Sequence, residues 1–129
     1  VIFFMLNGVS TSGTDNLRLR IGPVGGVETT GYNGFTGDQV ATNTSWSTSI
    51  LISVANAAAN TWNGTIKMWL QNSSTNSWVI ETFNYTTAIT TLGQGVGNKS
   101  LAGTLDRVEI SMTGANTFDA GAVNIMYSS

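Results

Sequence analysis

The chain has 129 residues, of which 9% are charged, with a net charge of −2 and neither cysteine nor histidine. The length fits one domain, residues 1–129, and the missing residue types exclude disulfides, cysteine-based metal sites and histidine catalysis, so we expect no metal and no cofactor. Five scattered cations argue against a nucleic-acid surface, and no apolar run has transmembrane length, so neither nucleic-acid binding nor membrane insertion is expected.

The chain opens on an apolar run, VIFFML at 1–6, with no charge to flank it. Such a run is typical of a buried strand rather than of a free chain end. We therefore expect the true start to lie upstream and the chain to be the C-terminal part of a longer protein. The same run should bury Phe3 or Phe4 in the core or against a neighbouring chain, so both are candidate interface residues.

The first clear strand pattern lies at 17–21, where Leu17, Leu19 and Ile21 alternate with two arginines. This alternation predicts a half-buried strand with Arg18 and Arg20 facing outward. Further strands are predicted at 27–32, 46–54, 66–71, 78–85, 100–105, 108–112 and 123–127. The alanine-rich stretch 54–60 is too short for a stable helix and is predicted to be a loop, and the glycine-rich stretch 93–97 is predicted to be a flexible turn.

About eight short strands separated by turns of glycine, asparagine and serine indicate an all-β fold. We predict an antiparallel β-sandwich with a jelly-roll-like arrangement.

Four segments of the chain carry a family likeness. They are STSGTDNLRLRIG at 10–22, GVETTGY at 26–32, LAGTLDRV at 101–108 and TFDAGAVNIMY at 117–127. In this order they resemble the terminal β-sandwich domain of tailed-bacteriophage fibre-type structural proteins. The resemblance implies a virion protein, often a homotrimer, that is displayed on a tail fibre or on the capsid beside other virion proteins. It brings no catalytic residues with it.

The four tryptophans are candidates either for sugar-stacking platforms or for the core and subunit interfaces that aromatic side chains dominate. Trp69 is the best surface candidate, because Ile66, Met68 and Leu70 are expected to take the opposite face of its strand. Trp78 follows the polar loop 72–76. The candidate glycan-binding residues are Tyr32, Asn33, Trp69 and Trp78, with contacts from loops 33–45 and 72–76. Trp69 is also a candidate interface residue.

The candidates for catalytic acids are the seven carboxylates, of which Asp15 and Asp38 are also candidate calcium ligands: Asp15, Glu28, Asp38, Glu81, Asp106, Glu109 and Asp119. A glycoside hydrolase needs two carboxyl groups at a set separation, and the sequence offers no such pair in a setting rich in titratable groups. Asp15 and Asp38 lie in no recognisable calcium loop, and local Asx-turns are the favoured role for them.

The sequence therefore predicts a non-enzymatic virion structural protein, located on the extracellular particle. Its fibre-type domain would serve for display and for attachment to a host-surface glycan. A capsid decoration or cement protein is the first alternative, and a carbohydrate-binding module of a secreted enzyme is an alternative of another class. The partners expected are further copies in a trimer, other virion proteins and the glycan.

Overall fold

The computed structural model describes residues 1–39, 42–88 and 91–129 and contains ten strands over this part of the chain, with no helix. The strands are β1 Ile2–Thr11, β2 Leu17–Gly22, β3 Tyr32–Gly37, β4 Asn43–Trp46, β5 Ile50–Leu51, β6 Trp62–Asn72, β7 Ser77–Thr86, β8 Thr91–Ser100, β9 Arg107–Met112 and β10 Phe118–Tyr127. All strand pairs are antiparallel.

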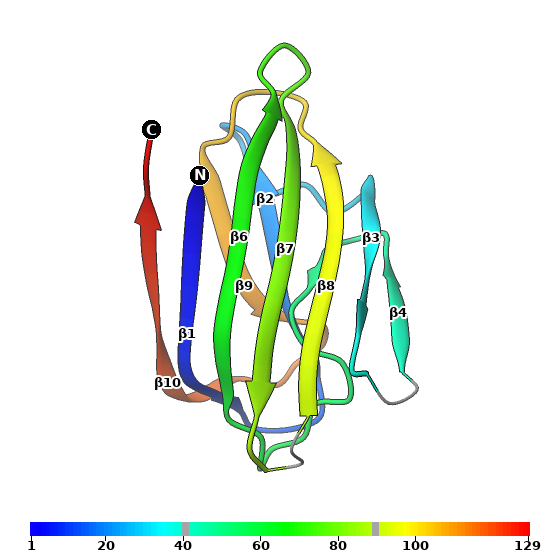
Figure 1. Ribbon diagram of the computed structural model, residues 1–129, viewed down its shortest axis with the longest axis vertical. Helices are drawn as coiled ribbons and strands as arrows, with labels where there is room; N and C mark the ends of the chain where they lie inside the picture. Colours follow the sequence, from blue (N-terminus) through cyan, green and yellow to red (C-terminus); the bar gives the residue numbers. More distant parts are fainter. Residues whose placement is uncertain (40–41, 89–90) are drawn as a thin grey trace.

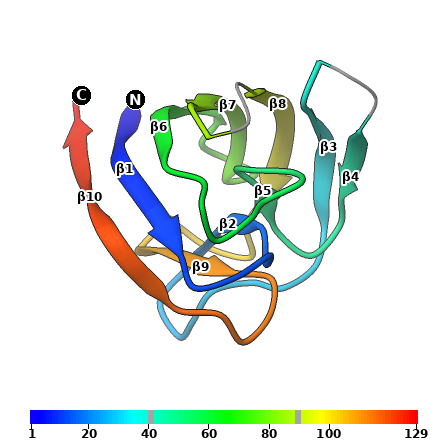
Figure 2. The ribbon, with the colours of Figure 1, turned by 90° about the horizontal axis from the view of Figure 1, so that it is seen from below.

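The strands form two layers. A seven-stranded sheet runs in the order β10-β1-β6-β7-β8-β3-β4, and a three-stranded sheet runs β5-β2-β9. Seen from below, the larger sheet follows an arc, and the smaller sheet lies on the inner side of that arc (Figure 1, Figure 2). The predicted all-β sandwich is confirmed, with ten strands in place of about eight and with layers of unequal size.

The alternation in the sequence is what separates the two faces of each sheet. In β2, Leu17, Leu19 and Ile21 are fully buried while Arg18 and Arg20 are half-exposed, as predicted. In β7, Ile80 is buried on the inner face, and Glu81 is exposed on the outer face. Because side chains alternate with a period of two, one buried position fixes the face of every other residue in the strand.

The apolar run at the start of the chain is β1, which lies between β10 and β6. Phe4 and Leu6 point into the core, where Phe4 is completely buried, and Phe3 lies half-buried on the opposite face. The expectation that Phe3 or Phe4 is buried is confirmed. The ring of Phe4 is covered by the chain's own core, and its role at an interface stays a prediction.

Two tryptophans are fixed in the core by hydrogen bonds to small polar side chains. The indole N–H of Trp46 donates to Thr36 Oγ1 over 2.8 Å, and the Thr36 hydroxyl donates to the Leu51 carbonyl over 2.7 Å. The indole N–H of Trp62 donates to Asn56 Oδ1 over 2.8 Å. A buried indole needs such a partner, so Trp46 and Trp62 serve packing rather than binding.

Four predicted segments differ from the structure. Residues 27–31 and 101–105 are loops, and only Trp46, Ile50 and Leu51 of the predicted strand 46–54 lie in strands, at the end of β4 and in β5. The glycine-rich stretch 93–97 lies inside β8, an interior strand of the larger sheet. Gly95 and Gly97 face inward, where an added Cβ would clash with Thr36 and with Trp46. The glycines are therefore a packing requirement of the strand, and the bulky partners that impose it come from β3 and β4.

We expect Gly97→Ala to lower the free energy of unfolding by about 1 to 3 kcal/mol, because the added methyl group has no room beside the Trp46 ring. Urea denaturation of the variant measures this. Gly103→Ala is the matched control, since Gly103 lies in a loop and the nearest atom to its Cβ position is Pro23 Cβ at 3.2 Å. Equal losses in the two variants would contradict the packing role of Gly97.

Candidate functional site

The outer face is defined here as the solvent-facing side of the seven-stranded sheet, away from the smaller sheet. One row of directly paired residues crosses it from β1 to β3. The row consists of Phe3, Lys67, Glu81, Val96 and Phe35. It places two opposite charges side by side in the middle and an aromatic ring at each end.

A second row runs beside the first, two residues further along each strand. It consists of Met5, Thr65, Phe83, Gln94, Gly37 and Asn43. Gly37 contributes no side chain, so the row is interrupted between Gln94 and Asn43. A hollow of about 610 Å³ opens over these two rows, with Phe35, Phe83 and Val96 among its apolar lining residues.

The apolar lining of this hollow is unusually exposed. Phe35 is 64% exposed, Val96 58% and Phe83 56%, although each lies on a regular strand. Scattered single apolar residues are normal on a protein surface, but a cluster beside polar groups marks a binding surface. Strand spacing and rise put the Cα atoms of Phe35 and Phe83 about 12 Å apart, the span of a disaccharide. The outer face is therefore the candidate site.

Lys67 and Glu81 are the two charged residues among those that line the hollow. They lie directly opposite each other on β6 and β7. Around them the polar groups are amides and hydroxyls, above all Gln94, Asn43 and Thr65. Such a surface can donate and accept hydrogen bonds without a net field, which suits an uncharged polar ligand.

Two of the four predicted glycan-binding residues share a third row of the outer face. Trp69 on β6 pairs with Val79, Val79 pairs with Asn98, and Asn98 pairs with Asn33 on β3. Asn33 is exposed and Trp69 is half-buried. The structure thus brings Trp69 and Asn33 onto the same face as the hollow. The expected face of Leu70 is correct but its burial is not, since Leu70 is 48% exposed near the end of β6.

The other two predicted residues are wrong, because they lie on the inner side of the sheet. Tyr32 and Trp78 belong to the row that contains Lys99, and they are only 2% and 9% exposed. Neither ring offers a free face to a sugar. The Tyr32 hydroxyl accepts a hydrogen bond from the Ile21 amide over 2.9 Å and lies 2.9 Å from the Glu28 carbonyl, to which it donates.

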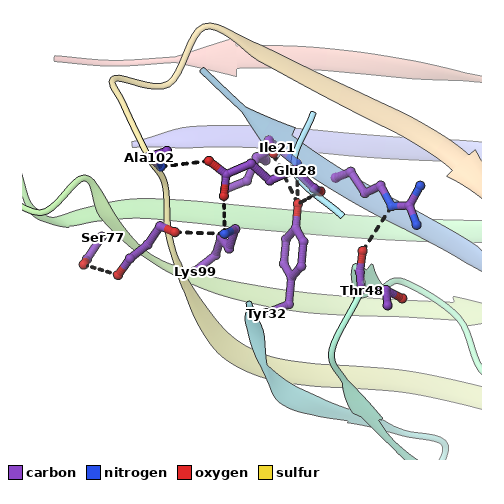
Figure 3. A network of polar contacts seen from close by, with 9 residues as sticks. Ile21, Glu28, Tyr32, Thr48, Ser77, Lys99 and Ala102 are labelled. Atoms are coloured by element: carbon purple, nitrogen blue, oxygen red, sulfur yellow. Dashed lines mark hydrogen bonds and ion pairs between the residues drawn. The ribbon is translucent and has the colours of Figure 1, made fainter. Parts of the chain in front are cut away.

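Tyr32 belongs to a polar clamp that joins the two layers, shown in Figure 3. Lys99 on β8 is buried and forms an ion pair with Glu28 of the 23–31 loop. The same ammonium group donates to the Ser100 carbonyl over 2.9 Å and lies 5.3 Å from the centre of the Tyr32 ring. Glu28 also accepts a hydrogen bond from the Ala102 amide over 2.8 Å. The clamp has a structural role, because the Lys99 ammonium group and the Glu28 carboxylate bind each other rather than a ligand.

The clamp shifts the pKa values of two of its members. Burial alone would raise the pKa of Glu28, but the Ala102 amide and the Lys99 ammonium outweigh burial and hold this pKa below its ordinary value of 4.5. Burial raises the pKa of Tyr32, against the hydrogen bond from Ile21. Both groups are therefore fixed in one protonation state near neutral pH.

Three further carboxylates accept hydrogen bonds that stabilise the fold. Asp15 accepts a hydrogen bond from the Asn116 amide over 2.8 Å, which links two loops that are distant in sequence and replaces the predicted local turn. Asp38 does accept a local bond, from the Thr42 amide over 3.0 Å. Asp119 lies in β10 and accepts a hydrogen bond from the Ser10 hydroxyl. Over the described ranges, no group of three or more acidic side chains could hold a metal ion.

The predicted binding loops also differ from expectation. The described part of 33–45 forms most of the β3–β4 hairpin, with Val40 and Ala41 outside the described residues. Residues 72–76 form the exposed turn between β6 and β7, where the Ser74 amide donates to Asn72 Oδ1 over 2.9 Å. The sequence-based prediction missed Phe35, Phe83, Val96 and Gln94 as site residues. The outward position of Phe83 was readable from the alternation of 78–85, whereas the assignment of 93–97 to a turn concealed Gln94 and Val96.

Comparison with known proteins finds no family model, no curated protein and no solved structure that matches this chain. The resemblance to phage fibre domains thus stays a prediction from the four sequence segments. Within the part of the chain that the structure describes, no helix is both long and apolar enough to cross a membrane.

The ion pair of the clamp predicts a loss of stability in acid. A carboxyl group whose pKa is lowered by folding contributes stability above its unfolded pKa of 4.5, and this contribution is lost as pH falls through the lower folded value. We expect Glu28→Gln to cost about 2 to 3 kcal/mol at neutral pH, below the usual range for a fully buried pair because Glu28 retains some contact with solvent. The difference from the unsubstituted protein should shrink below about pH 4.5.

Urea denaturation of both proteins across this pH range provides the measurement. Asp106→Asn is the control, because the pair of Asp106 with Arg107 is more than 40% exposed on both sides and such pairs contribute little. If the two variants lose the same stability at neutral pH, the clamp does not have the role assigned to it.

Proposed function

We propose that this chain is a non-enzymatic bacteriophage virion structural domain of the fibre type, whose outer face attaches the particle to an uncharged host-surface glycan. The observation that carries the proposal is the hollow on the outer face, where exposed aromatic rings stand beside amide and hydroxyl groups on a rigid sheet. The four sequence segments that resemble fibre domains supply the virion context.

The chemistry of the hollow suits a sugar chain. One face of a pyranose ring is made of C–H groups, which pack on an aromatic ring such as Phe35 or Phe83, while the hydroxyl groups at the rim need polar partners. Gln94, Asn43 and Thr65 can supply those partners, with Lys67 and Glu81 as a matched pair of opposite charge. The volume of about 610 Å³ lies within the range of small-molecule sites.

A non-enzymatic role is supported by the use of the carboxylates. Glu28 pairs with Lys99, Asp106 pairs with Arg107, and Glu109 accepts a hydrogen bond from the Ser111 hydroxyl over 2.9 Å. A glycosidase needs one carboxyl group with a raised pKa next to a second one. The carboxyl group of Glu28 has a lowered pKa and holds the fold together.

Display in several copies would supply the strength that one site lacks. A shallow open hollow gives modest affinity, and linked copies on one particle multiply it without any new contact. The resemblance implies a trimer among other virion proteins, which fits this mode of attachment.

A capsid decoration protein is the second candidate function. Val96 and Phe83 are exposed apolar groups in the middle of a strand, and a neighbouring virion protein could cover them as well as a sugar could. The two functions differ in what binds the outer face. Binding to glycans and binding to purified capsids, measured on the same protein, therefore separate them.

We expect Phe83→Ala to weaken glycan binding about tenfold or more, since a stacking ring at the centre of a site contributes over 1 kcal/mol. The protein, biotinylated and displayed on streptavidin so that its valency is fixed, is applied to a glycan array. Phe118→Ala is the matched control, because Phe118 is 42% exposed but lies on β10, away from the hollow. If no glycan binds and the protein associates tightly with purified capsids, the proposed attachment function is wrong and capsid decoration takes its place.

Binding should also be insensitive to ionic strength. Because Lys67 and Glu81 are the two charged residues among those that line the hollow, we expect the affinity to change less than about twofold between about 0.05 M and about 0.5 M salt. The measurement is the affinity for the glycan found on the array, determined at several salt concentrations within this range. A steep loss of affinity with salt would indicate a charged ligand held by Lys67.

A further inference from the structure

The two edges of the seven-stranded sheet are built differently. β4 at one edge is only four residues long and has the polar sequence NTSW, whereas β10 at the other edge has ten residues and is exposed along its whole length. Proteins usually protect sheet edges with short strands, charges or proline. β4 meets the first of these conditions. β10 has a single charge, Asp119, near its start.

The regular part of β10 is the stretch 122–127, which pairs with β1 without interruption from Asn7 to Ile2. Before it, the register shifts at Gly121, whose φ of 94° favours glycine. The bulge thus interrupts the hydrogen-bond ladder at one end, and the stretch 122–127 that follows it is an uncharged, regularly paired edge.

The backbone groups on the free side of this edge can be assigned. Val1 and Ser128 exchange two hydrogen bonds, of 2.9 Å and 3.0 Å, so Ser128 directs its backbone groups toward β1. In an antiparallel pair this direction alternates from residue to residue. Asn124 therefore faces β1, while the N–H and C=O groups of Val123, Ile125 and Tyr127 point away from it. The Ile125 amide donates to the side chain of Asn124 over 3.0 Å, a local bond that a neighbouring strand could replace.

An apolar groove lies along the inner side of the same edge. It has a volume of about 320 Å³ and is lined by Phe4, Val123 and Ile125 of the larger sheet and by Val108 and Ile110 of β9. A smaller hollow of about 230 Å³ also includes Ile125 and reaches Tyr127. In Figure 2, β10 is the last strand of the arc, and no described strand lies beyond it.

We propose that two copies of this chain pair through β10, antiparallel and around a two-fold axis at Asn124, so that the larger sheet continues from one copy into the other. An antiparallel edge is complementary to its own copy, because a two-fold axis matches each donor with an acceptor. The two Asp119 side chains, the one charged side chain of each β10, fall at opposite ends of the pair and do not oppose each other.

The register follows from the backbone assignment. With Asn124 opposite its own copy, Val123 of each protomer stands opposite Ile125 of the other. These are the residues whose N–H and C=O groups point outward, so Val123 and Ile125 of the other copy can form a hydrogen-bonded pair, in which each residue donates one bond and accepts one. Their side chains lie on the inner face and add an apolar cross-strand contact over the joined grooves. The two Asn124 residues would face each other on the axis as a non-hydrogen-bonded pair, in which the Cα atoms are closer together.

Because the chain has no cysteine, a single substitution tests the register. Asn124→Cys should form a disulfide-linked dimer under mild oxidation, since closely paired residues have Cβ atoms at a distance that a disulfide can bridge. Ser45→Cys is the control, because Ser45 is exposed on β4 at the opposite edge. Absence of a cross-link at residue 124, or equal cross-linking at residue 45, would overturn the proposed pairing.

Sedimentation velocity of the unsubstituted protein should show a dimer that increases with concentration. Ile125→Pro removes an outward N–H that β1 does not use, and proline is tolerated at such edge positions, so this variant should be a folded monomer. Val123→Lys, which places a cation on each copy beside the axis, should be monomeric too, whereas Ser45→Lys on β4 should remain dimeric. Far-UV circular dichroism and thermal unfolding verify the fold of each variant.

A monomer at all concentrations, or a trimer unaffected by Ile125→Pro and Val123→Lys, would overturn the proposal. The result is independent of the glycan measurement, because that assay fixes the valency on streptavidin and tests the outer face alone.

Discussion

The two sheets pack on one hydrophobic core, and a buried ammonium group adds the polar link that fixes their positions. Lys99 projects inward from the end of β8 and meets Glu28, which is carried by the loop between β2 and β3. Burying such a pair has a desolvation cost that only complete hydrogen bonding offsets. Lys99 meets this condition with the Glu28 carboxylate, the Ser100 carbonyl and the Tyr32 ring. Tyr32 then reaches across to the backbone of Ile21 in the smaller sheet.

This link explains why the outer face can remain exposed. The inner side of β3 and β8 is fixed by Tyr32, Lys99 and the inward glycines of β8, so the strands keep their positions without any cover on the other side. Phe35 and Val96 are neighbours of these residues in sequence and point the opposite way. A rigid inner side and a variable outer side are what a binding surface on a sheet requires.

Much of the fold was predictable because alternation needs only local information. Leu17, Leu19 and Ile21 were placed on the correct face from spacing alone. Trp78 shares its face with Ile80, so its burial followed from the same alternation, although its residue type suggested a binding role. Tyr32 is a different case, since its inward direction depends on Lys99 and Glu28, which are 67 and 4 residues away in sequence.

The glycine-rich strand could not be recognised from local sequence. Gly95 and Gly97 are disfavoured in strands, and only the bulk of Thr36 and Trp46 across the sheet makes them necessary. The site was hidden for the same reason, because Gln94 and Val96 alternate with these glycines in β8. Two of the four predicted binding residues, Asn33 and Trp69, lie on the outer face beside the hollow.

The contrast between the two edge strands also limits how large an assembly can grow. Joining two copies at β10 uses the long edge of each larger sheet, and among the described strands the four-residue β4 remains at each end of the combined sheet. A short polar strand is a poor template for further strand addition. Sheet growth would therefore terminate by itself after one step, in a closed dimer rather than an open-ended fibril.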